Sequence, residues 1–220
     1  MTLDSYMIGG IRMLHRAFNP DNVVWRFISK MVDLVLLTCM WAICCLPIIT
    51  VGASTTALYE VVGRLAKDKE GYLTVNFFQS MKENFWQSTR VWLLMLLSMA
   101  LIGTAGWWYM HISSPVRALC MPVVVILGVI LMMMMVYSFP FISRCKLTDS
   151  QLLSMAFVMS IKNAGWTLFM LASAVCILAV GLFVAYPVLL IGPGVTAYIH
   201  TKILDEVFRL YQFSDERDKG

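Results

Sequence analysis

Two stretches of the sequence decide the fold. Residues Val91–Ile112 read VWLLMLLSMALIGTAGWWYMHI, and residues Ala118–Ile142 read ALCMPVVVILGVILMMMMVYSFPFI. Neither stretch contains Asp, Glu, Lys or Arg. A helix needs about 20 residues to cross a hydrocarbon core of about 30 Å, so each stretch is long enough to span a membrane. The sequence therefore predicts two membrane-spanning helices joined by the short turn His111–Arg117.

The composition of the whole chain agrees with a membrane environment. Of the 220 residues, 60% are hydrophobic and only 14% are charged, whereas soluble domains carry about 25% charged residues. A chain with so little charge cannot cover a globule of its size with polar groups. These proportions exclude a soluble single domain, a disordered chain and a disulfide-rich secreted module. The predicted fold class is all-α, a polytopic helical membrane protein.

Two further apolar stretches, Met31–Leu46 and Thr167–Ile191, bring the number of clear spans to four. The first of them is shorter because Pro47 interrupts it. Four spans with a cytoplasmic amino terminus would place the segments 64–90 and 143–166 outside the cell, although both are rich in Lys and Arg. Such a distribution breaks the rule that cytoplasmic loops carry the excess of Lys and Arg.

A chain that doubles back twice resolves this conflict. The chain would reverse at Pro47–Ser54 and return through Thr55–Gly63. It would reverse again at Pro187–Gly194 and return through Val195–Ile203. Both loops and both termini are then cytoplasmic, and only Arg117 among the Lys and Arg residues stays outside. The sequence thus predicts four clear spans plus two shorter return or re-entrant helices, which other helices or water must shield.

These segments are predicted to form a single integral membrane domain of residues 1–220. Its parts are a cytoplasmic amphipathic leader, a helical hairpin, a cytoplasmic loop with an amphipathic helix, a second hairpin, a second cytoplasmic loop, a third hairpin and a cytoplasmic tail. In that order they cover residues 1–28, 29–63, 64–90, 91–142, 143–166, 167–207 and 208–220. The amphipathic segments are expected to lie on the inner membrane surface.

The two predicted reversals carry the same residue types at the same spacing. The two sets are Pro47, Gly52 and Thr56 in the first half and Pro187, Gly192 and Thr196 in the second. Pro ends or kinks a helix, Gly permits the turn that follows, and Thr can cap the returning helix. Two interpretations stay open. The residues are structural turn motifs, or they form a transport site, since broken helices often mark the binding sites of duplicated transporters.

The first cytoplasmic loop contains a candidate docking motif. Its apolar residues would share one face of an amphipathic helix, with polar residues such as Gln79 and Glu83 on the opposite face. The residues expected to contact a partner are Phe77, Phe78, Lys82 and Phe85. Trp86 would anchor this helix at the lipid headgroups. A second local feature is Glu60, spaced to form an ion pair with Arg64 along one helix.

No residue pattern points to catalysis or to a cofactor. The sequence has no H-E-x-x-H, G-x-S-x-G or phosphate-binding glycine loop. Its six cysteines form no C-x-x-C pair, and His15, His111 and His200 lie far apart, so no metal site is expected. We therefore expect no enzymatic activity, no catalytic residue and no cofactor. The net charge of +4 fits loops that face anionic lipid, and nucleic-acid binding is not expected.

Several runs of residues carry information beyond hydropathy. They are Phe18–Asn22, Trp25–Phe27, Leu46–Tyr59, Glu70–Tyr72, Phe77–Phe78 and Lys82–Phe85. Together they resemble the YesL family of bacterial membrane proteins, most densely over residues 18–92. The second half resembles this family mainly in hydropathy and in the turn Gly192–Gly194. The resemblance implies a protein of the bacterial cytoplasmic membrane whose relatives are often encoded beside carbohydrate-uptake transporters and polysaccharide-degradation systems. It transfers no catalytic or ligand-binding residue.

Three functional hypotheses follow from these observations. The favoured one is a non-enzymatic membrane protein, accessory to carbohydrate uptake, that binds transporter components through its cytoplasmic loops. The alternative is a small permease or channel with its site at the Pro/Gly breaks, and the third is an intramembrane enzyme. The lipid bilayer is the one certain partner, and a homo-oligomer is compatible with the sequence.

Overall fold

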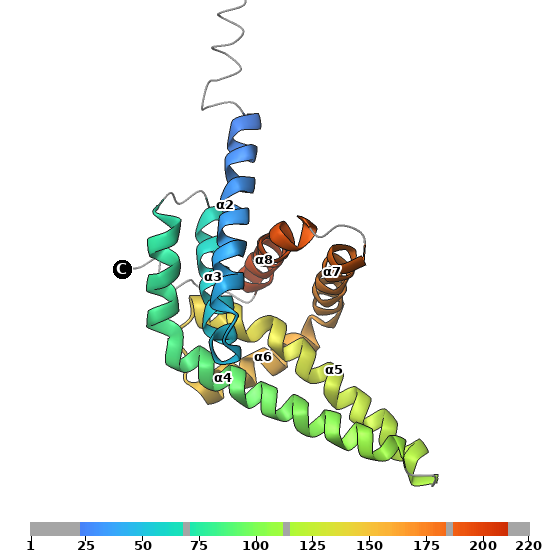
Figure 1. The fold of residues 1–220 in the computed structure, drawn as a ribbon. Coiled ribbons are helices and arrows are strands. Elements are labelled where there is room, and N and C mark those ends of the chain that lie inside the picture. Colours follow the sequence, from blue (N-terminus) through green and yellow to red (C-terminus); the bar gives the residue numbers. More distant parts are fainter. Residues whose placement is uncertain (1–22, 68–70, 112–114, 184–186, 211–220) are drawn as a thin grey trace, which may run out of the picture.

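The structure is a computed structural model that describes residues 23–67, 71–111, 115–183 and 187–210. Within these residues it contains seven α-helices and one short 3-10 helix (Figure 1). Their bounds are α2 Val23–Cys44, η1 Ile48–Thr50, α3 Val51–Ala66, α4 Leu73–Met110, α5 Pro115–Arg144, α6 Asp149–Lys162, α7 Ala164–Phe183 and α8 Pro187–Leu210. The described part contains no strand, so the all-α prediction is confirmed. The predicted leader up to residue 22 and the tail from residue 211 lie outside the described residues.

Pro47 and Thr50 shape the connection between α2 and α3. α2 ends at Cys44, Pro47 precedes η1, and α3 begins at Val51. The Thr50 hydroxyl donates to the carbonyl oxygen of Cys44 at 2.5 Å and lies 2.8 Å from the carbonyl oxygen of Pro47. Pro47 lacks the N–H that would continue α2, and Thr50 then satisfies a carbonyl group that the end of α2 leaves open.

α4 is one continuous helix of 38 residues. Hydropathy alone predicts a cytoplasmic loop that ends at residue 90 and a span that begins at Val91. The structure has no helix boundary there. Hydropathy changes at Arg90, but no Gly or Pro lies between Leu73 and Ile102 to end the helix. The predicted amphipathic helix and the predicted span are therefore parts of one continuous helix, whose axis bends between them (Figure 1).

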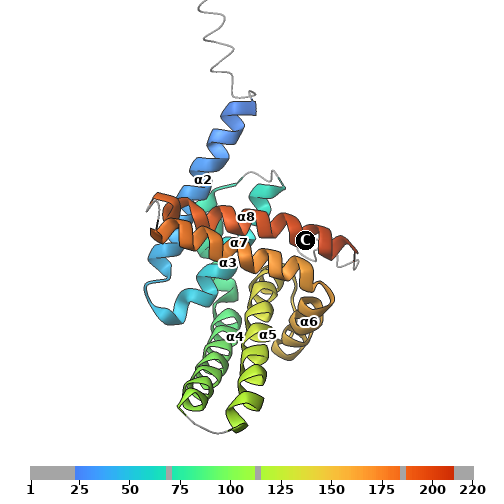
Figure 2. The ribbon, with the colours of Figure 1, turned by 90° about the vertical axis from the view of Figure 1, so that its right-hand side faces the viewer.

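α4 and α5 project together from the rest of the molecule (Figures 1 and 2). We call residues 93–110 of α4 and 115–132 of α5 the arm. The large apolar side chains that the arm exposes include Leu93, Leu94, Leu97, Leu101, Trp107, Trp108, Val123, Val125, Ile126 and Leu127. An apolar surface of this extent is unfavourable in water and suits contact with lipid.

Three helices are long and apolar enough to cross a membrane within the described residues. They are Leu73–Met110, Cys120–Arg144 and Ala164–Gly181. They overlap the second, third and fourth predicted spans. The first predicted span, Met31–Leu46, overlaps α2, which ends at Cys44 and is not among these three helices. A fourth crossing, the two return helices and the interfacial helices therefore stay predictions.

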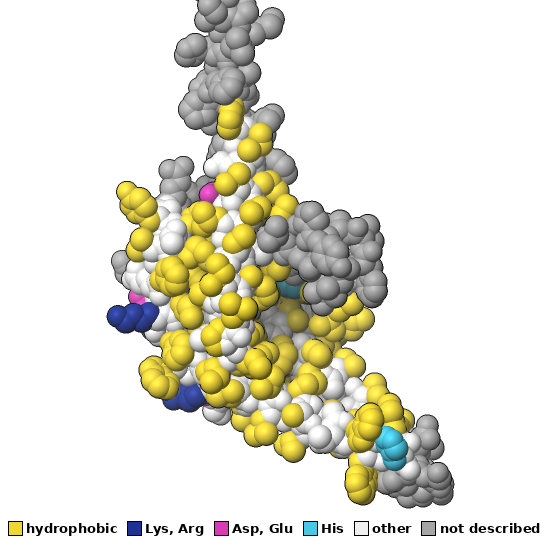
Figure 3. Space-filling view, in the orientation of Figure 1, with side chains coloured by type: hydrophobic (Ala, Val, Ile, Leu, Met, Phe, Trp, Pro, Cys, Tyr) yellow, Lys and Arg dark blue, Asp and Glu magenta, His cyan; other side chains and the backbone are white. Residues whose placement is uncertain are grey.

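α2 is nevertheless apolar on both sides. Leu34 and Leu37 are buried against the rest of the molecule. The opposite side exposes an apolar stripe at helical spacing, formed by Trp25, Ile28, Val32, Leu36 and Ile43. A helix that is apolar all round belongs in a protein core or in lipid. Hydrophobic side chains also cover most of α2 and of the arm on the face that Figure 3 shows.

Two apolar cores hold the helices together, and α8 contributes to both. One core contains Leu34, Leu37, Ala57, Leu58, Val61, Val62, Phe77 and Ala197. The other contains Val91, Met95, Tyr137, Phe141, Ile142, Leu152, Ala156, Met159, Met170, Leu204, Val207 and Phe208. Ala197 lies in the first core and Leu204 in the second, so α8 connects the α2–α3 side of the molecule to the α5–α7 side.

Gly194 sets the approach of α8 to α2. Its backbone N–H donates to the Thr38 hydroxyl at 3.1 Å, and that hydroxyl donates to the carbonyl oxygen of Leu34 at 2.8 Å. A Cβ atom at position 194 would lie 2.7 Å from Thr38 Oγ1 and 2.8 Å from the Leu34 oxygen. Only glycine therefore permits this contact. In Figure 2, α7 and α8 run across the direction of the arm.

Candidate functional site

The polar side chains of the molecule gather where the arm joins the body. We name this region the polar pole and define it by Glu60, Arg64, Ser80, Asn84, Arg144, Lys202 and Asp205. In Figure 3 the visible Lys and Arg side chains lie towards the body end of α4, away from the arm tip. The contacts within the pole join α3, α4, α5 and α8, which are the helices that carry these residues.

A buried carboxylate lies at the centre of the α3–α4 contact. Glu60 is 6% exposed. Its Oε2 accepts a hydrogen bond from Ser80 Oγ at 2.5 Å and a longer one from Asn84 Nδ2 at 3.4 Å. Its Oε1 accepts from Arg64 Nη2 at 2.9 Å, which confirms the predicted pairing along α3. A buried charge requires such partners, because its desolvation is otherwise strongly unfavourable.

The same two helices also approach closely at Gly52, two turns before Glu60 on α3. A Cβ atom at Gly52 would lie 2.7 Å from the carbonyl oxygen of Ser88 and 2.6 Å from Trp92 Cβ. Between these contacts, the Thr56 and Ser88 hydroxyls lie 2.8 Å apart and are hydrogen-bonded. Gly52, Thr56 and Glu60 are spaced by four residues and so lie on one face of α3. Small residues at this spacing let two helix backbones approach closely.

α5 and α8 complete the polar pole. Arg144, at the end of α5, forms an ion pair with Asp205 of α8, and its guanidinium lies 5.2 Å from the centre of the Phe208 ring. Lys202 Nζ donates to the carbonyl oxygen of Ala66 at 3.2 Å. Ala66 is the last residue of α3, whose terminal carbonyl groups lack partners within the helix. Lys202 therefore caps α3 from a different helix.

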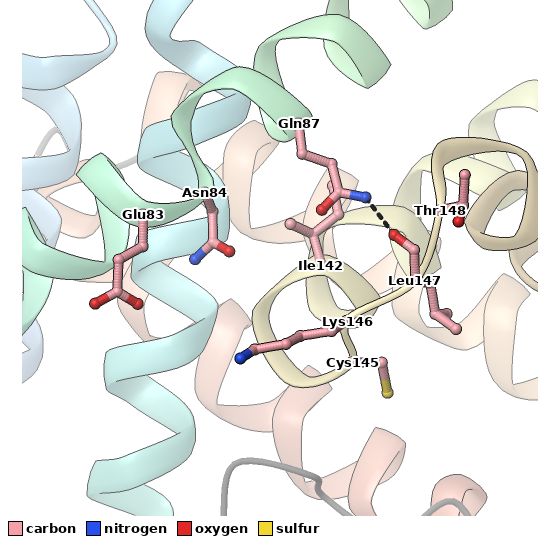
Figure 4. A pocket seen from close by; sticks show the side chains of 8 residues that line it. All are labelled: Glu83, Asn84, Gln87, Ile142, Cys145, Lys146, Leu147 and Thr148. Carbon is pink, nitrogen blue, oxygen red and sulfur yellow. Dashed lines mark hydrogen bonds between the residues drawn. The ribbon is translucent and has the colours of Figure 1, made fainter.

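Beside this region lies a pocket of about 610 Å³ (Figure 4). Its lining consists of Glu83, Asn84 and Gln87 of α4, Ile142 in the last turn of α5, and the connection Cys145–Thr148. Gln87 holds that connection in place, because its Nε2 donates to the Leu147 carbonyl oxygen at 2.7 Å. Lys146 extends across the pocket towards the side on which Glu83 lies (Figure 4).

Beside the pocket, an ion pair joins α4 to the start of α6. Arg90 Nε lies 3.0 Å from Asp149 Oδ2, and Gln87 Nε2 donates to Asp149 Oδ1 at 3.1 Å. Asp149 is the first residue of α6. These contacts fix the start of α6 against the middle of α4. No group of three or more His, Cys, Asp or Glu side chains in the described parts of the chain could hold a metal ion.

The candidate docking residues of α4 do not share one outward face. Phe77 is fully buried in the core with α3, whereas Phe78 is 53% exposed. Lys82 is exposed and Phe85 is half-buried. The buried side of this helix is largely polar, with Ser80, Asn84 and Ser88 as well as Phe77. Phe77 is therefore a core residue, and Phe78 and Lys82 are the candidates that face outward.

The predicted reversal at Pro187–Gly194 is wrong, because Pro187, Gly192 and Thr196 all lie within one continuous helix, α8. The glycines of both sets are instead sites of close helix packing. Gly52 contacts α4, and a Cβ atom at Gly192 would lie 2.6 Å from the Ile177 side chain of α7. Thr56 donates to the Gly52 carbonyl oxygen at 3.0 Å, and Thr196 donates to that of Gly192 at 2.8 Å. In both sets the Thr hydroxyl therefore donates to the carbonyl oxygen of the Gly four residues before it. Pro47 precedes η1, whereas Pro187 is the first residue of α8.

His200 links three helices, although the sequence indicated no role for it. Its Nδ1 lies 3.0 Å from the Tyr59 hydroxyl of α3, and its Nε2 lies 3.0 Å from the Met170 carbonyl oxygen of α7. Ser173 Oγ lies 3.1 Å from the same Nε2. Met170 O can only accept, so Nε2 carries the proton and Nδ1 accepts from Tyr59. This network connects α7 and α8 to α3.

The fold and these contacts define a helical membrane protein. A family described as protein of unknown function, DUF624, matches residues 34–105, from the middle of α2 to the arm portion of α4. The match is compatible with the resemblance to the YesL family and covers the Glu60 contacts with Ser80 and Asn84. No curated protein and no solved structure matches the chain.

Proposed function

We propose that this chain is a non-enzymatic protein of the bacterial cytoplasmic membrane that acts as an accessory to carbohydrate uptake or polysaccharide utilisation. In this proposal the arm crosses the bilayer, and the polar pole and both termini are cytoplasmic. A transporter component binds the outward side of the inner half of α4. The carbohydrate context rests on the resemblance to the YesL family.

One observation supports a docking role more than any other. α4 continues without a break from the arm into the polar pole, where Phe78 and Lys82 are exposed although neighbouring Phe77 is in the core. Trp86 on the same segment is 76% exposed. Aromatic residues are enriched at protein interfaces, and Trp together with Lys or Arg is typical of the cytoplasmic membrane surface. The segment is also held rigidly, because Ser80 and Asn84 are bonded to Glu60.

The close packing at Gly52 and Gly192 disfavours the permease alternative. Each of these glycines contacts a neighbouring helix so tightly that a Cβ atom would clash. A transport site at the breaks needs space for a substrate, whereas these positions serve helix contact. The pocket described above lies elsewhere, between α4 and the α5–α6 connection.

Affinity purification from native bacterial membranes tests the docking proposal. The tagged wild-type chain is expected to enrich a carbohydrate-transporter component. The double variant Phe78→Ala with Lys82→Glu is expected to lose this enrichment. Trp107→Ala at the arm tip is the matched control, because Trp107 is similarly exposed at the other end of α4. Equal enrichment by all three proteins, or no enrichment by the wild type, contradicts the proposal.

A further inference from the structure

The exposed tryptophans of α4 indicate how deep the pocket lies in the membrane. Trp86 is 76% exposed, and Trp107 and Trp108 at the other end of the helix are 69% and 70% exposed. At 1.5 Å per residue, Trp86 and Trp107 are separated by about 32 Å along α4, close to the thickness of a hydrocarbon core. Exposed tryptophans mark the two interfaces of a membrane-spanning helix. Glu83, Asn84 and Gln87 flank Trp86, so the pocket lies at the level of the lipid headgroups.

The pocket presents two opposite charges that do not neutralise each other. Glu83 accepts a hydrogen bond from Gln79 at 2.9 Å, on its own helix. Lys146 lies on the α5–α6 connection and extends into the pocket (Figure 4). Among the described residues, no ion pair joins the two. They therefore face a shared space of about 610 Å³ from opposite walls.

We propose that this pocket binds a group that carries both a phosphate and a primary ammonium, as the headgroup of phosphatidylethanolamine does. Lys146 is the partner of the phosphate, and Glu83 is the partner of the ammonium. The Thr148 side chain, on the same connection as Lys146, supplies a further hydrogen-bonding group. The volume is within the range of small-molecule sites, which run from about 300 to about 1,000 Å³.

The opposite charges of Lys146 and Glu83 also predict which phospholipid headgroup the pocket prefers. A phosphatidylglycerol headgroup has no ammonium, so it would form no ionic contact with Glu83. A phosphatidylcholine headgroup has a quaternary ammonium, which has no N–H to donate to a carboxylate. The pocket is therefore expected to prefer ethanolamine over both. This proposal concerns lipid recognition and does not depend on any transporter partner.

Native mass spectrometry of the full-length protein in detergent, with added lipid, tests this proposal. The probes are phosphatidylethanolamine, phosphatidylcholine and phosphatidylglycerol of matched acyl chains. Wild type is expected to retain phosphatidylethanolamine preferentially. Lys146→Gln and Glu83→Gln are each expected to weaken that retention about fivefold, as the loss of one partly exposed ionic contact does. The control is Glu206→Gln on α8, an exposed carboxylate outside the pocket lining.

The source of the ligand is identified in a second arm with soluble phosphoethanolamine as competitor. Displacement only at large excess identifies the membrane lipid as the ligand, and displacement at equal concentration identifies a soluble ligand of the same chemistry. Two results overturn the proposal. One is equal retention of all three lipids by wild type. The other is unchanged retention in Lys146→Gln and Glu83→Gln proteins whose circular dichroism shows an intact helical fold.

Discussion

Ser80 Oγ donates a 2.5 Å hydrogen bond to Glu60 Oε2, so a serine of α4 satisfies a carboxylate that α3 buries. Removing that carboxylate leaves the Ser80 hydroxyl without this acceptor in a closed contact. Glu60→Ala is therefore expected to lower the free energy of unfolding by about 2 kcal/mol. The value is moderate because the Arg64 side chain is 46% exposed and can turn to solvent. Unfolding in detergent, followed by circular dichroism, measures the change.

The control for this prediction is Glu206→Ala. Glu206 also pairs with an arginine on its own helix, Arg209, but both side chains are exposed. Its replacement is expected to change stability by less than about 0.5 kcal/mol. Similar effects of the two substitutions would contradict the importance of the buried contact.

Gly52 and Gly103 offer a second matched comparison. A Cβ atom at Gly52 would lie 2.7 Å from a backbone oxygen of α4, whereas nothing lies within 4 Å of one at Gly103. Gly52→Ala is expected to force α3 and α4 apart and to destabilise the protein by about 1 to 3 kcal/mol. Gly103→Ala is expected to stabilise the arm by up to about 1 kcal/mol, because alanine favours a helix. Thermal unfolding of both variants distinguishes these signs.

The ion pair between Arg144 and Asp205 is expected to contribute measurably to stability. The Arg144 side chain is only 10% exposed and Asp205 is 33% exposed, so solvent screens the pair weakly. Arg144→Met leaves Asp205 without its partner and is expected to cost about 2 kcal/mol. A double-mutant cycle with Asp205→Asn isolates the pairwise part. A coupling free energy near zero would show that Arg144 acts through its contact with Phe208 instead.

Thiol labelling tests the orientation of the polar pole. Engineered cysteines at Lys67, beyond the end of α3, and at His111, at the arm tip, are compared in a background without the native cysteines. With the polar pole cytoplasmic, a membrane-impermeant reagent labels His111→Cys in intact cells and labels Lys67→Cys only after permeabilisation. The reverse pattern would invert the proposed topology and move the docking segment outside the cell.

The sequence predicted the arm well because a membrane span is encoded locally. Hydropathy and length suffice to identify α5, whose residues 118–142 lie wholly within the helix. The start of α4 was not predicted, because a change in hydropathy at Arg90 looks like a helix boundary. The backbone stays helical through that change in hydropathy. Helix continuity depends on propensity and on breaking residues, and the sequence of α4 has no such residue near Arg90.

The polar pole was harder to predict because its contacts join distant segments. The ion pair of Glu60 and Arg64 follows from their spacing on one helix. The hydrogen bond from Ser80 depends on the docking of α4 against α3. The available signal was the recurrence of Ser80, Asn84 and Ser88 at intervals of one helical turn, which marks a polar helix face. The neighbouring large apolar residues, including Phe77, instead suggested that the apolar face of this helix binds a partner, and so they hid the fact that its polar face packs against α3.

The unbroken backbone of α4 has a mechanical consequence. A thinner bilayer tilts a spanning helix that is too long for it, and a thicker one makes the helix more upright. Although the axis of α4 bends in Figure 1, its helical hydrogen bonding continues from the apolar portion to the portion that carries Phe78 and Glu83. In the proposed topology, a change of tilt in the membrane-spanning portion would therefore pass through the bend to the inner end, so that bilayer thickness would alter the orientation of the docking segment.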